Sequence, residues 1–280
     1  MPADLALDTA VQPIPEAPGW YAAHLSDAWN WRLPAGGVLM TVGLRAIQAA
    51  LGDPGFKPVS ATAIFCNAVP AGPLEVKVEI LRRGNAAVQA RAALRAPPSR
   101  GPDLEVSATF ARERQGIDLL DAAPPAVPPP GGAPAFLEPG PHKTRGRYPF
   151  LDNFEGRLAQ GHPWWEQGWS PGPARFARWM RYLVPQTLAD GSLDPLAIPP
   201  IADTMPPAIQ QKLGPEGPNF YAPSLDLTVH FLDPTPSAWL LVSAWARRAR
   251  AGYATAETEI WGEDGRLAAY ATQTMMLRRR

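Results

Sequence analysis

Four apolar runs separated by turn signals occupy residues 223–277, and this pattern limits the possible folds more than any other feature of the sequence. In the first run, residues 224–231, apolar and polar side chains alternate with the two-residue period of a β-strand. A Glu-Asp-Gly-Arg turn at residues 263–266 separates the last two runs, and Gly265 within it allows a positive φ. Four short runs joined by turns predict an antiparallel meander.

Two polar residues of this meander lie where polarity is costly: Asp226 near the start of the first strand, and Gln273 inside an otherwise apolar strand. The alternation places Asp226 on the opposite face of its strand from Leu225 and Leu227. A buried carboxylate is costly without a partner, and a carboxamide is a suitable partner because its N–H can donate to the carboxylate. The sequence leaves two interpretations open: a buried pair, or two side chains on a solvated face of the sheet.

The meander also carries a series of motifs that resembles a known family. It contains Ser-Leu-Asp-x-x-x-x-Phe from residue 224, Trp-Leu-Leu from residue 239, Asp-Gly-Arg-Leu-x-Ala from residue 264 and Gln-x-x-x-Leu-Arg from residue 273. This series resembles the C-terminal half of the acyl-CoA thioesterase II family. The resemblance implies an α+β double hotdog fold, in which two antiparallel sheets are each wrapped around a central helix.

The resemblance also implies a catalytic site. In that family an Asp, a Gln and a Thr or Ser hold the water that attacks the thioester, and the motifs match the first two to Asp226 and Gln273. The third does not match cleanly, because the strand after Trp239 has Arg or Ala where the hydroxyl is expected. Thr228 and Ser243 are the candidates to supply that hydroxyl.

Gly36 and Gly37 precede a nearly continuous apolar pattern at residues 38–51, which predicts a buried helix ended by Gly52. The free N–H groups at the start of a helix favour negative charge, and glycine lets a substrate approach the backbone closely. The residues alone favour a permissive loop before a buried helix. The resemblance implies that Gly36 and Gly37 polarise the thioester carbonyl.

A proline-rich segment at residues 115–149 predicts an extended linker, because proline removes backbone donors and fixes φ. It divides the chain into an N-terminal domain, residues 1–114, and a C-terminal domain, residues 150–280. Each half is predicted to contain a strand, a helical segment and four further strands, which is an internal repeat. Only the second copy carries Asp226 and Gln273, so we expect one active site per chain.

Composition and motifs exclude several other classes of function. The formal net charge is zero, so nothing indicates nucleic-acid binding. The four histidines lack the spacing of metal ligands, and neither a Gly-x-Ser-x-Gly motif nor a glycine-rich phosphate loop is present. We therefore expect no metal and no cofactor. The one cysteine, Cys66, lies in an apolar strand pattern and is expected to be a small buried residue, not a nucleophile.

The resulting hypothesis is an acyl-CoA thioesterase, in which Asp226 is the general base and Gln273 orients the water. The alternative is a catalytically impaired protein of the same fold that binds acyl-CoA or an acyl carrier. The N-terminus resembles no secretory signal and no apolar run reaches membrane-spanning length, so we expect a cytoplasmic protein that does not contact membranes. The resemblance further implies a homodimer.

Overall fold

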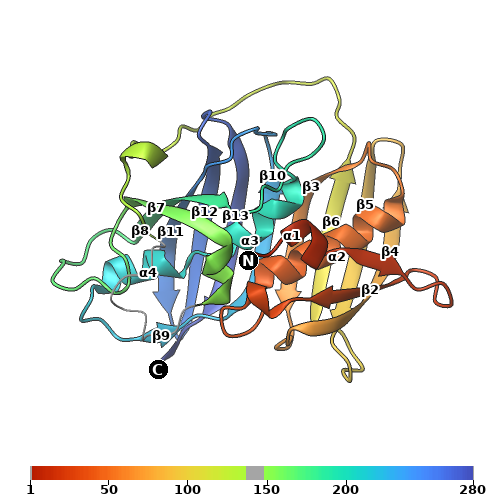
Figure 1. Cartoon of the computed structure of the whole chain (residues 1–280), viewed down its shortest axis with the longest axis horizontal. Helices are drawn as coiled ribbons and strands as arrows, with labels where there is room; N and C mark the ends of the chain where they lie inside the picture. The colour runs from red at the N-terminus through yellow and green to blue at the C-terminus, as the bar shows by residue number, and fades with distance from the viewer. Residues whose placement is uncertain (1, 137–147, 280) are drawn as a thin grey trace.

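The computed structural model describes residues 2–136 and 148–279. Twelve of its strands form one large antiparallel sheet with helices on one side, and two short strands form a separate ribbon (Figure 1). The N-terminal half contains α1 (Leu5–Asp8), β1 (Val11–Pro13), β2 (Trp20–Leu25), η1 (Asp27–Trp29), α2 (Gly36–Leu51), β3 (Lys57–Phe65), β4 (Gly72–Arg83), β5 (Ala87–Arg95) and β6 (Leu104–Ala111). None of the helices in the described residues combines the length and the apolar composition needed to cross a lipid bilayer.

The C-terminal half repeats this plan with a more broken helical segment. It contains η2 (Pro130–Gly132), η3 (Pro149–Asn153), β7 (Phe154–Gln160), β8 (Arg175–Tyr182), η4 (Pro195–Ala197), α3 (Ile198–Ala202), α4 (Pro206–Leu213), β9 (Phe220–Tyr221), β10 (Ser224–Phe231), β11 (Leu240–Arg250), β12 (Tyr253–Gly262), β13 (Leu267–Met276) and β14 (Arg278–Arg279). The predicted meander is β10 to β13, and it is confirmed.

The main sheet has twelve strands in the order β1-β2-β4-β5-β6-β3-β10-β13-β12-β11-β8-β7. Read outward from the centre, the two halves follow the same order, which is the internal repeat seen as topology. They are joined by antiparallel pairing of β3 with β10, in which Thr62 lies opposite Thr228. The expectation of two separate sheets is therefore corrected: the halves share one hydrogen-bonded sheet.

Helix α2 is the predicted buried helix, and its 16 residues pack against β4, β5 and β6. Its side chains are apolar on most sides, so most of the helix is removed from water. The helix ends at Gly52, whose φ of 61° places it in the left-handed conformation that glycine adopts readily. Thr41 Oγ1 donates to the carbonyl of Leu196 at 2.8 Å and so ties α2 to η4 of the other half.

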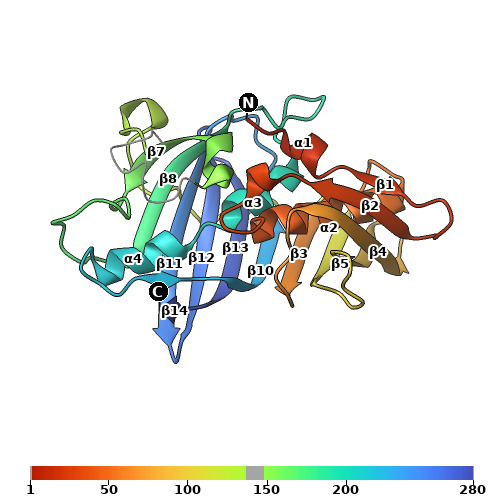
Figure 2. The ribbon, with the colours of Figure 1, turned by 60° about the horizontal axis from the view of Figure 1, so that its bottom comes forward.

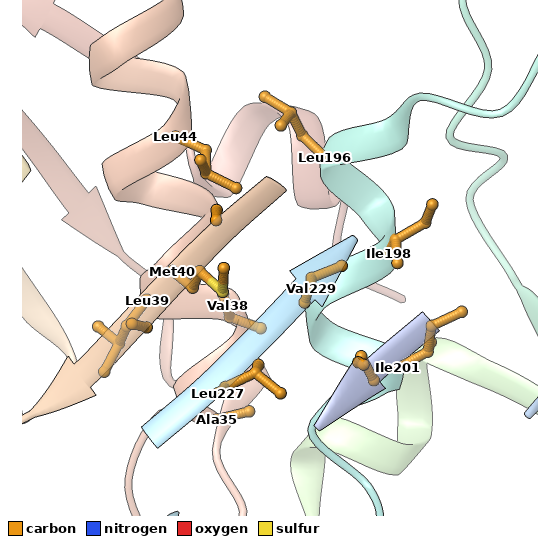
Figure 3. Packing of buried hydrophobic residues seen from close by; sticks show 14 of the residues in the cluster. Ala35, Val38, Leu39, Met40, Leu44, Leu196, Ile198, Ile201, Leu227 and Val229 are labelled. Carbon is orange, nitrogen blue, oxygen red and sulfur yellow. The ribbon is translucent and has the colours of Figure 1, made fainter. Parts of the chain in front are cut away.

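The C-terminal half has no single long helix among its described residues. Pro199 and Pro200 lie in the first turn of α3, and Pro206 and Pro207 begin α4 and separate it from α3. Side chains of α2 such as Val38 and Met40 meet Ile201 of α3 and Leu227 of β10 in one continuous apolar core (Figure 3). The expected central helix is thus present in the N-terminal half and is replaced by two short helices in the C-terminal half.

The chain between β6 and η2 contains no helix or strand, and its last part covers the outer face of the C-terminal sheet. Trp179 Nε1 donates to the carbonyl of Pro128 at 2.8 Å, and Ala133 packs against Trp179, Leu241 and Trp261. Residues 137–147, part of the predicted linker at residues 115–149, lie outside the described residues. The domain boundaries at 114 and 150 stay predictions.

Candidate active site

The best-formed polar cluster in the core surrounds Asp203, which caps the C-terminal end of α3 and is 9% exposed. Its Oδ1 accepts a hydrogen bond from Ser224 Oγ at 2.8 Å and another from Gln273 Nε2. Its Oδ2 accepts one from the backbone N–H of Gly37 at 3.0 Å. The site therefore joins α3, β10 and β13 of the C-terminal half to the first turn of α2 from the N-terminal half (Figures 1 and 2).

Ser224 and Gln273 face the same side of the sheet because β10 has a bulge at its start. The pairing shifts between Ser224, opposite Met275, and Asp226, opposite Thr274. The extra residue changes the phase of the alternation, so Ser224 lies on the inner face together with Leu227. There Ser224 Oγ accepts a hydrogen bond from Gln273 Nε2 at 2.7 Å.

The other side-chain atom of Gln273, the carbonyl Oε1, is buried and has no hydrogen-bond partner among the described residues. Gln273 as a whole is only 1% exposed. A buried acceptor without a partner costs free energy, and such a group in a polar site is a natural acceptor for a water or a substrate donor. The cluster can thus bind one further donor next to the Asp203 carboxylate.

Burial raises the pKa of Asp203 above its ordinary value. Hydrogen bonds from Ser224, Gly37, Gln273 and Gly36 act in the opposite direction, because they stabilise the ionised form, but burial dominates. A carboxylate with a raised pKa is a stronger base than an exposed one.

Gly36 and Gly37 have no room for a side chain. A Cβ on Gly37 would overlap the backbone carbonyl of Pro199, and a Cβ on Gly36 would lie 2.6 Å from the ring of Phe65. The two glycines thus allow α2 to approach α3 until the Gly37 N–H reaches Asp203. Gly37 was expected to polarise the thioester carbonyl through its backbone N–H. That N–H already donates a hydrogen bond to the Asp203 carboxylate.

The expected pair of Asp226 and Gln273 is wrong as a contact. Asp226 lies opposite Thr274 and its Oδ1 accepts the Thr274 N–H at 2.9 Å, whereas Gln273 lies opposite Leu227. Directly opposite residues of an antiparallel pair point to the same face. Asp226 and Gln273 therefore point to opposite faces of the sheet, and the solvated-face interpretation fits Asp226 alone.

The two candidates for the third residue also lie away from Gln273. Thr228 Oγ1 is 2.9 Å from Thr62 Oγ1 on the outer face, where β10 pairs with β3. Ser243 lies opposite Glu259 on β12, and its backbone carbonyl accepts a hydrogen bond from the Thr258 hydroxyl. Cys66, expected to be buried, is exposed at the end of β3.

Sequence reasoning missed Asp203 and Ser224. Asp203 is a lone carboxylate within the apolar, proline-rich residues 195–205, which is the same signal that singled out Asp226. Ser224 opens the Ser-Leu-Asp motif, but regular alternation assigns it to the face of Asp226. No group of three or more His, Cys, Asp or Glu side chains within the described part of the chain is placed to hold a metal ion.

Comparison with known proteins identifies the family. A family model described as the acyl-CoA thioesterase N-terminal domain matches residues 25–112, and one described as the acyl-CoA thioesterase C-terminal domain matches residues 120–277. No curated protein matches the chain significantly in sequence.

Solved structures share the fold over nearly the whole chain. A conserved protein with a hot dog fold from Alicyclobacillus acidocaldarius superimposes with a TM-score of 0.80 at 22% identity, covering 98% of this chain and 97% of that one. The acyl-CoA thioesterase II TesB2 from Mycobacterium marinum gives 0.73 at 20% identity and 99% coverage of both chains. The tesB protein of Mycobacterium avium subsp. paratuberculosis gives 0.75 at 18% identity and 98% coverage of both. The fold is a hotdog fold, and the chain belongs to the acyl-CoA thioesterase family.

Proposed function

We propose that the chain hydrolyses acyl-CoA thioesters, with Asp203 as the general base and with Ser224 and Gln273 as the groups that position the attacking water. The observation that carries this proposal is the buried Asp203 carboxylate beside Gln273 Oε1, a buried acceptor without a partner in the described part of the chain. A water held there donates one O–H to Gln273 Oε1 and the other to Asp203. The resemblance assigned the base to Asp226 and the orientation of the water to Gln273. Asp226 and the two candidates for the third hydroxyl, Thr228 and Ser243, lie on the other face of the sheet.

The proposed reaction needs one water and no cofactor. The water oxygen forms a bond to the thioester carbonyl carbon while Asp203 takes its proton. The tetrahedral intermediate then breaks its C–S bond, and the leaving thiolate receives the proton from Asp203 to give free acid and CoA. General-base assistance of this kind contributes about 100- to 10,000-fold to the rate. In this scheme Gly36 and Gly37 hold the carboxylate in place, because the Gly37 N–H donates to Asp203 Oδ2.

The alternative from a different class is a protein that binds acyl-CoA or an acyl carrier without turnover. Its main support was a missing hydroxyl beside Gln273. Ser224 Oγ lies 2.7 Å from Gln273 Nε2 and 2.8 Å from Asp203 Oδ1, so that support no longer holds. Hydrolysis is therefore the better-supported function.

The test measures thiol release from acyl-CoAs of varied chain length by the purified chain and by two matched carboxylate variants. We expect Asp203→Asn to lower kcat at least about 100-fold, because it removes the base. Asp226→Asn should retain kcat within threefold, since Asp226 faces away from Gln273. Loss of activity in Asp226→Asn alone would return the base to Asp226, and no hydrolysis by the unmodified chain would favour the binding alternative.

The assembly and location of the chain stay predictions. The family resemblance supports a homodimer, and light scattering that gives twice the monomer mass at micromolar concentration would agree with it. A single species of monomer mass would contradict it. A cytoplasmic location rests on the sequence expectation alone.

A further inference from the structure

Arg32, Tyr221 and Arg278 meet on the surface next to the candidate active site. The Arg32 guanidinium carbon lies 5.4 Å from the centre of the Tyr221 ring. Arg278 lies directly opposite Tyr221 in the pairing of β14 with β9, so the two side chains share a face of this ribbon. Both arginines are exposed. We call these three residues the arginine cluster.

The arginine cluster lies within a short reach of the reacting groups. Tyr221 precedes Ser224 by three residues, a distance of at most about 10 Å along an extended chain. Arg278 follows Met275, the residue paired with Ser224, by the same interval. Arg32 stands four residues before Gly36 at the start of α2. Each member of the cluster thus lies within four residues of a residue that forms or adjoins the site.

No carboxylate neutralises the cluster within the described residues. The arginines that form ion pairs lie elsewhere, and they are Arg45, Arg91, Arg95, Arg112, Arg157, Arg181, Arg247 and Arg266. Further unpaired positive charge adjoins the cluster, since Arg279 follows Arg278 and Arg250 lies on the β11–β12 hairpin. That hairpin is held beside β14, because the Leu277 N–H donates to the Gly252 carbonyl at 2.7 Å (Figure 2).

We propose that the arginine cluster binds the phosphate groups of the nucleotide part of coenzyme A. This proposal rests on the proposed function, and it names the groups that recognise the carrier end of the substrate. Arginine binds phosphate bidentately through its N–H edge. The Arg32 guanidinium lies over the Tyr221 ring and makes no hydrogen bond or ion pair among the described residues, so its N–H groups are free to bind an anion. Coenzyme A carries its phosphates at the far end of the pantetheine arm, so a phosphate site outside the buried thioester site fits its shape.

The test compares two substrates that share a thioester and differ in the nucleotide: an acyl-CoA and the matching acyl-pantetheine. We expect Arg32→Ala/Arg278→Ala to raise KM for the acyl-CoA at least about tenfold, since each charge-assisted contact contributes substantially to binding. The value of kcat should stay within twofold, and KM for the acyl-pantetheine should stay within twofold as well. Circular dichroism melting checks that the variant is folded.

The matched control is Arg100→Ala/Arg114→Ala, which removes two exposed arginines of the N-terminal half that form no ion pair among the described residues. The total charge changes equally in the two variants, so the control should leave both KM values unchanged. An equal rise of KM for acyl-CoA in the control, or a rise for acyl-pantetheine in the cluster variant, would overturn the proposal. Activity lost with an acyl-carrier protein but kept with acyl-CoA would assign the cluster to protein docking and overturn it too.

Binding of free CoA separates this proposal from the proposed function. Titration calorimetry of CoA and of pantetheine needs no turnover, so it reports on the cluster even when the unmodified chain hydrolyses nothing. We expect the cluster variant to weaken CoA binding at least tenfold relative to the control variant. Equal CoA affinity in the two variants would refute the phosphate site, whatever the outcome of the hydrolysis assay.

Discussion

At the scale of single residues, burial of the Asp203 carboxylate is energetically unfavourable. The carboxylate is 9% exposed and its pKa is raised by desolvation, although Ser224, Gln273 and Gly37 donate to it. Perturbed carboxyls of this kind cluster at functional sites, because the same burial that costs stability makes the group a better base. Asp226, by contrast, has a backbone donor on a partly exposed face and no comparable environment.

The raised pKa of Asp203 predicts the shape of the pH–rate profile. The base must be ionised, so kcat should fall as the pH decreases through the raised pKa, above the range of an ordinary carboxyl group. The free energy of unfolding should show the opposite pH dependence and should fall as the pH rises. The folded state binds the Asp203 proton more tightly than the unfolded state, so this group lowers stability as the pH rises.

Both effects are checked with Asp203→Asn. The variant should be more resistant to urea than the unmodified chain at pH 7.5, and this advantage should vanish as the pH falls below the ordinary carboxyl range. Activity of the unmodified chain is measured between pH 4 and 9 in parallel. An acidic limb at the ordinary carboxyl position, with no stability gain in the variant, would contradict a buried base.

Arg178 on β8 is a second residue whose burial is unfavourable. It is 1% exposed, its Nη2 has no hydrogen-bond partner among the described residues, and desolvation lowers its pKa to about 10. The rings of Phe136 and Phe176 lie 5.6 and 6.0 Å from its guanidinium carbon and compensate only in part. We expect Arg178→Met to stabilise the chain by about 1 kcal/mol or more at pH 8, since an apolar side chain needs no partner.

Urea unfolding at two pH values tests both whether Arg178→Met stabilises the chain and whether the buried charge of Arg178 is the reason. The folded state loses the Arg178 proton at lower pH than the unfolded state, so the unmodified chain gains stability as the pH rises above about 10. The advantage of Arg178→Met should therefore be smaller at pH 10.5 than at pH 8. Arg175→Met, an exposed position on the same strand, is the control. Destabilisation by Arg178→Met would mean that the guanidinium has a stabilising partner.

At the scale of elements, the sequence predicted what depends on regular periods. The helical pattern of α2 and the strands of the meander follow from local side chains, and both predictions are confirmed. The site depends on an irregularity that no period reveals. The bulge between Ser224 and Asp226 brings Ser224 to the core face and leaves Asp226 on the other face, so regular alternation could not place Ser224 beside Gln273.

The close approach of α2 to α3 is a feature of these two elements, and the substitution Gly37→Ala, which adds one methyl group, tests it. Alanine is the better helix former by about 1 kcal/mol, so Gly37→Ala would stabilise an unconstrained helix. Here the added Cβ overlaps the Pro199 carbonyl, and α2 must move away from Asp203. We expect a loss of about 1–3 kcal/mol in stability and a marked drop in kcat.

The control for Gly37→Ala is Gly101→Ala, because a Cβ at Gly101 meets no atom within 4 Å. Thermal melting and the thioesterase assay are applied to both variants. Unchanged stability and activity in Gly37→Ala would show that α2 does not need this contact to present its N–H to Asp203.

At the scale of the whole molecule, the two halves are joined through both the sheet and the site. The β3–β10 pairing makes one sheet, and a single apolar core includes α2, α3 and β10. The site itself is divided, since Gly37 belongs to the N-terminal half and Asp203, Ser224 and Gln273 to the other. The internal repeat therefore describes the topology, whereas folding and chemistry belong to the complete chain.

Because the two halves share a sheet, a core and a site, we predict that neither half folds and hydrolyses acyl-CoA alone. Residues 1–114 produced separately would expose the β3 edge and the face of α2 that packs on α3, and unpaired strand edges promote aggregation. Residues 115–280 would keep Asp203 but lose the Gly37 N–H that positions it. We expect both pieces to elute as aggregates or to lack cooperative melting, with thiol release at least about 100-fold below that of the full chain. Co-expression of the two pieces should restore part of the activity, because the contacts between the two halves are non-covalent. A C-terminal piece that melts cooperatively and hydrolyses acyl-CoA at the full rate would show that α2 contributes nothing to the reaction.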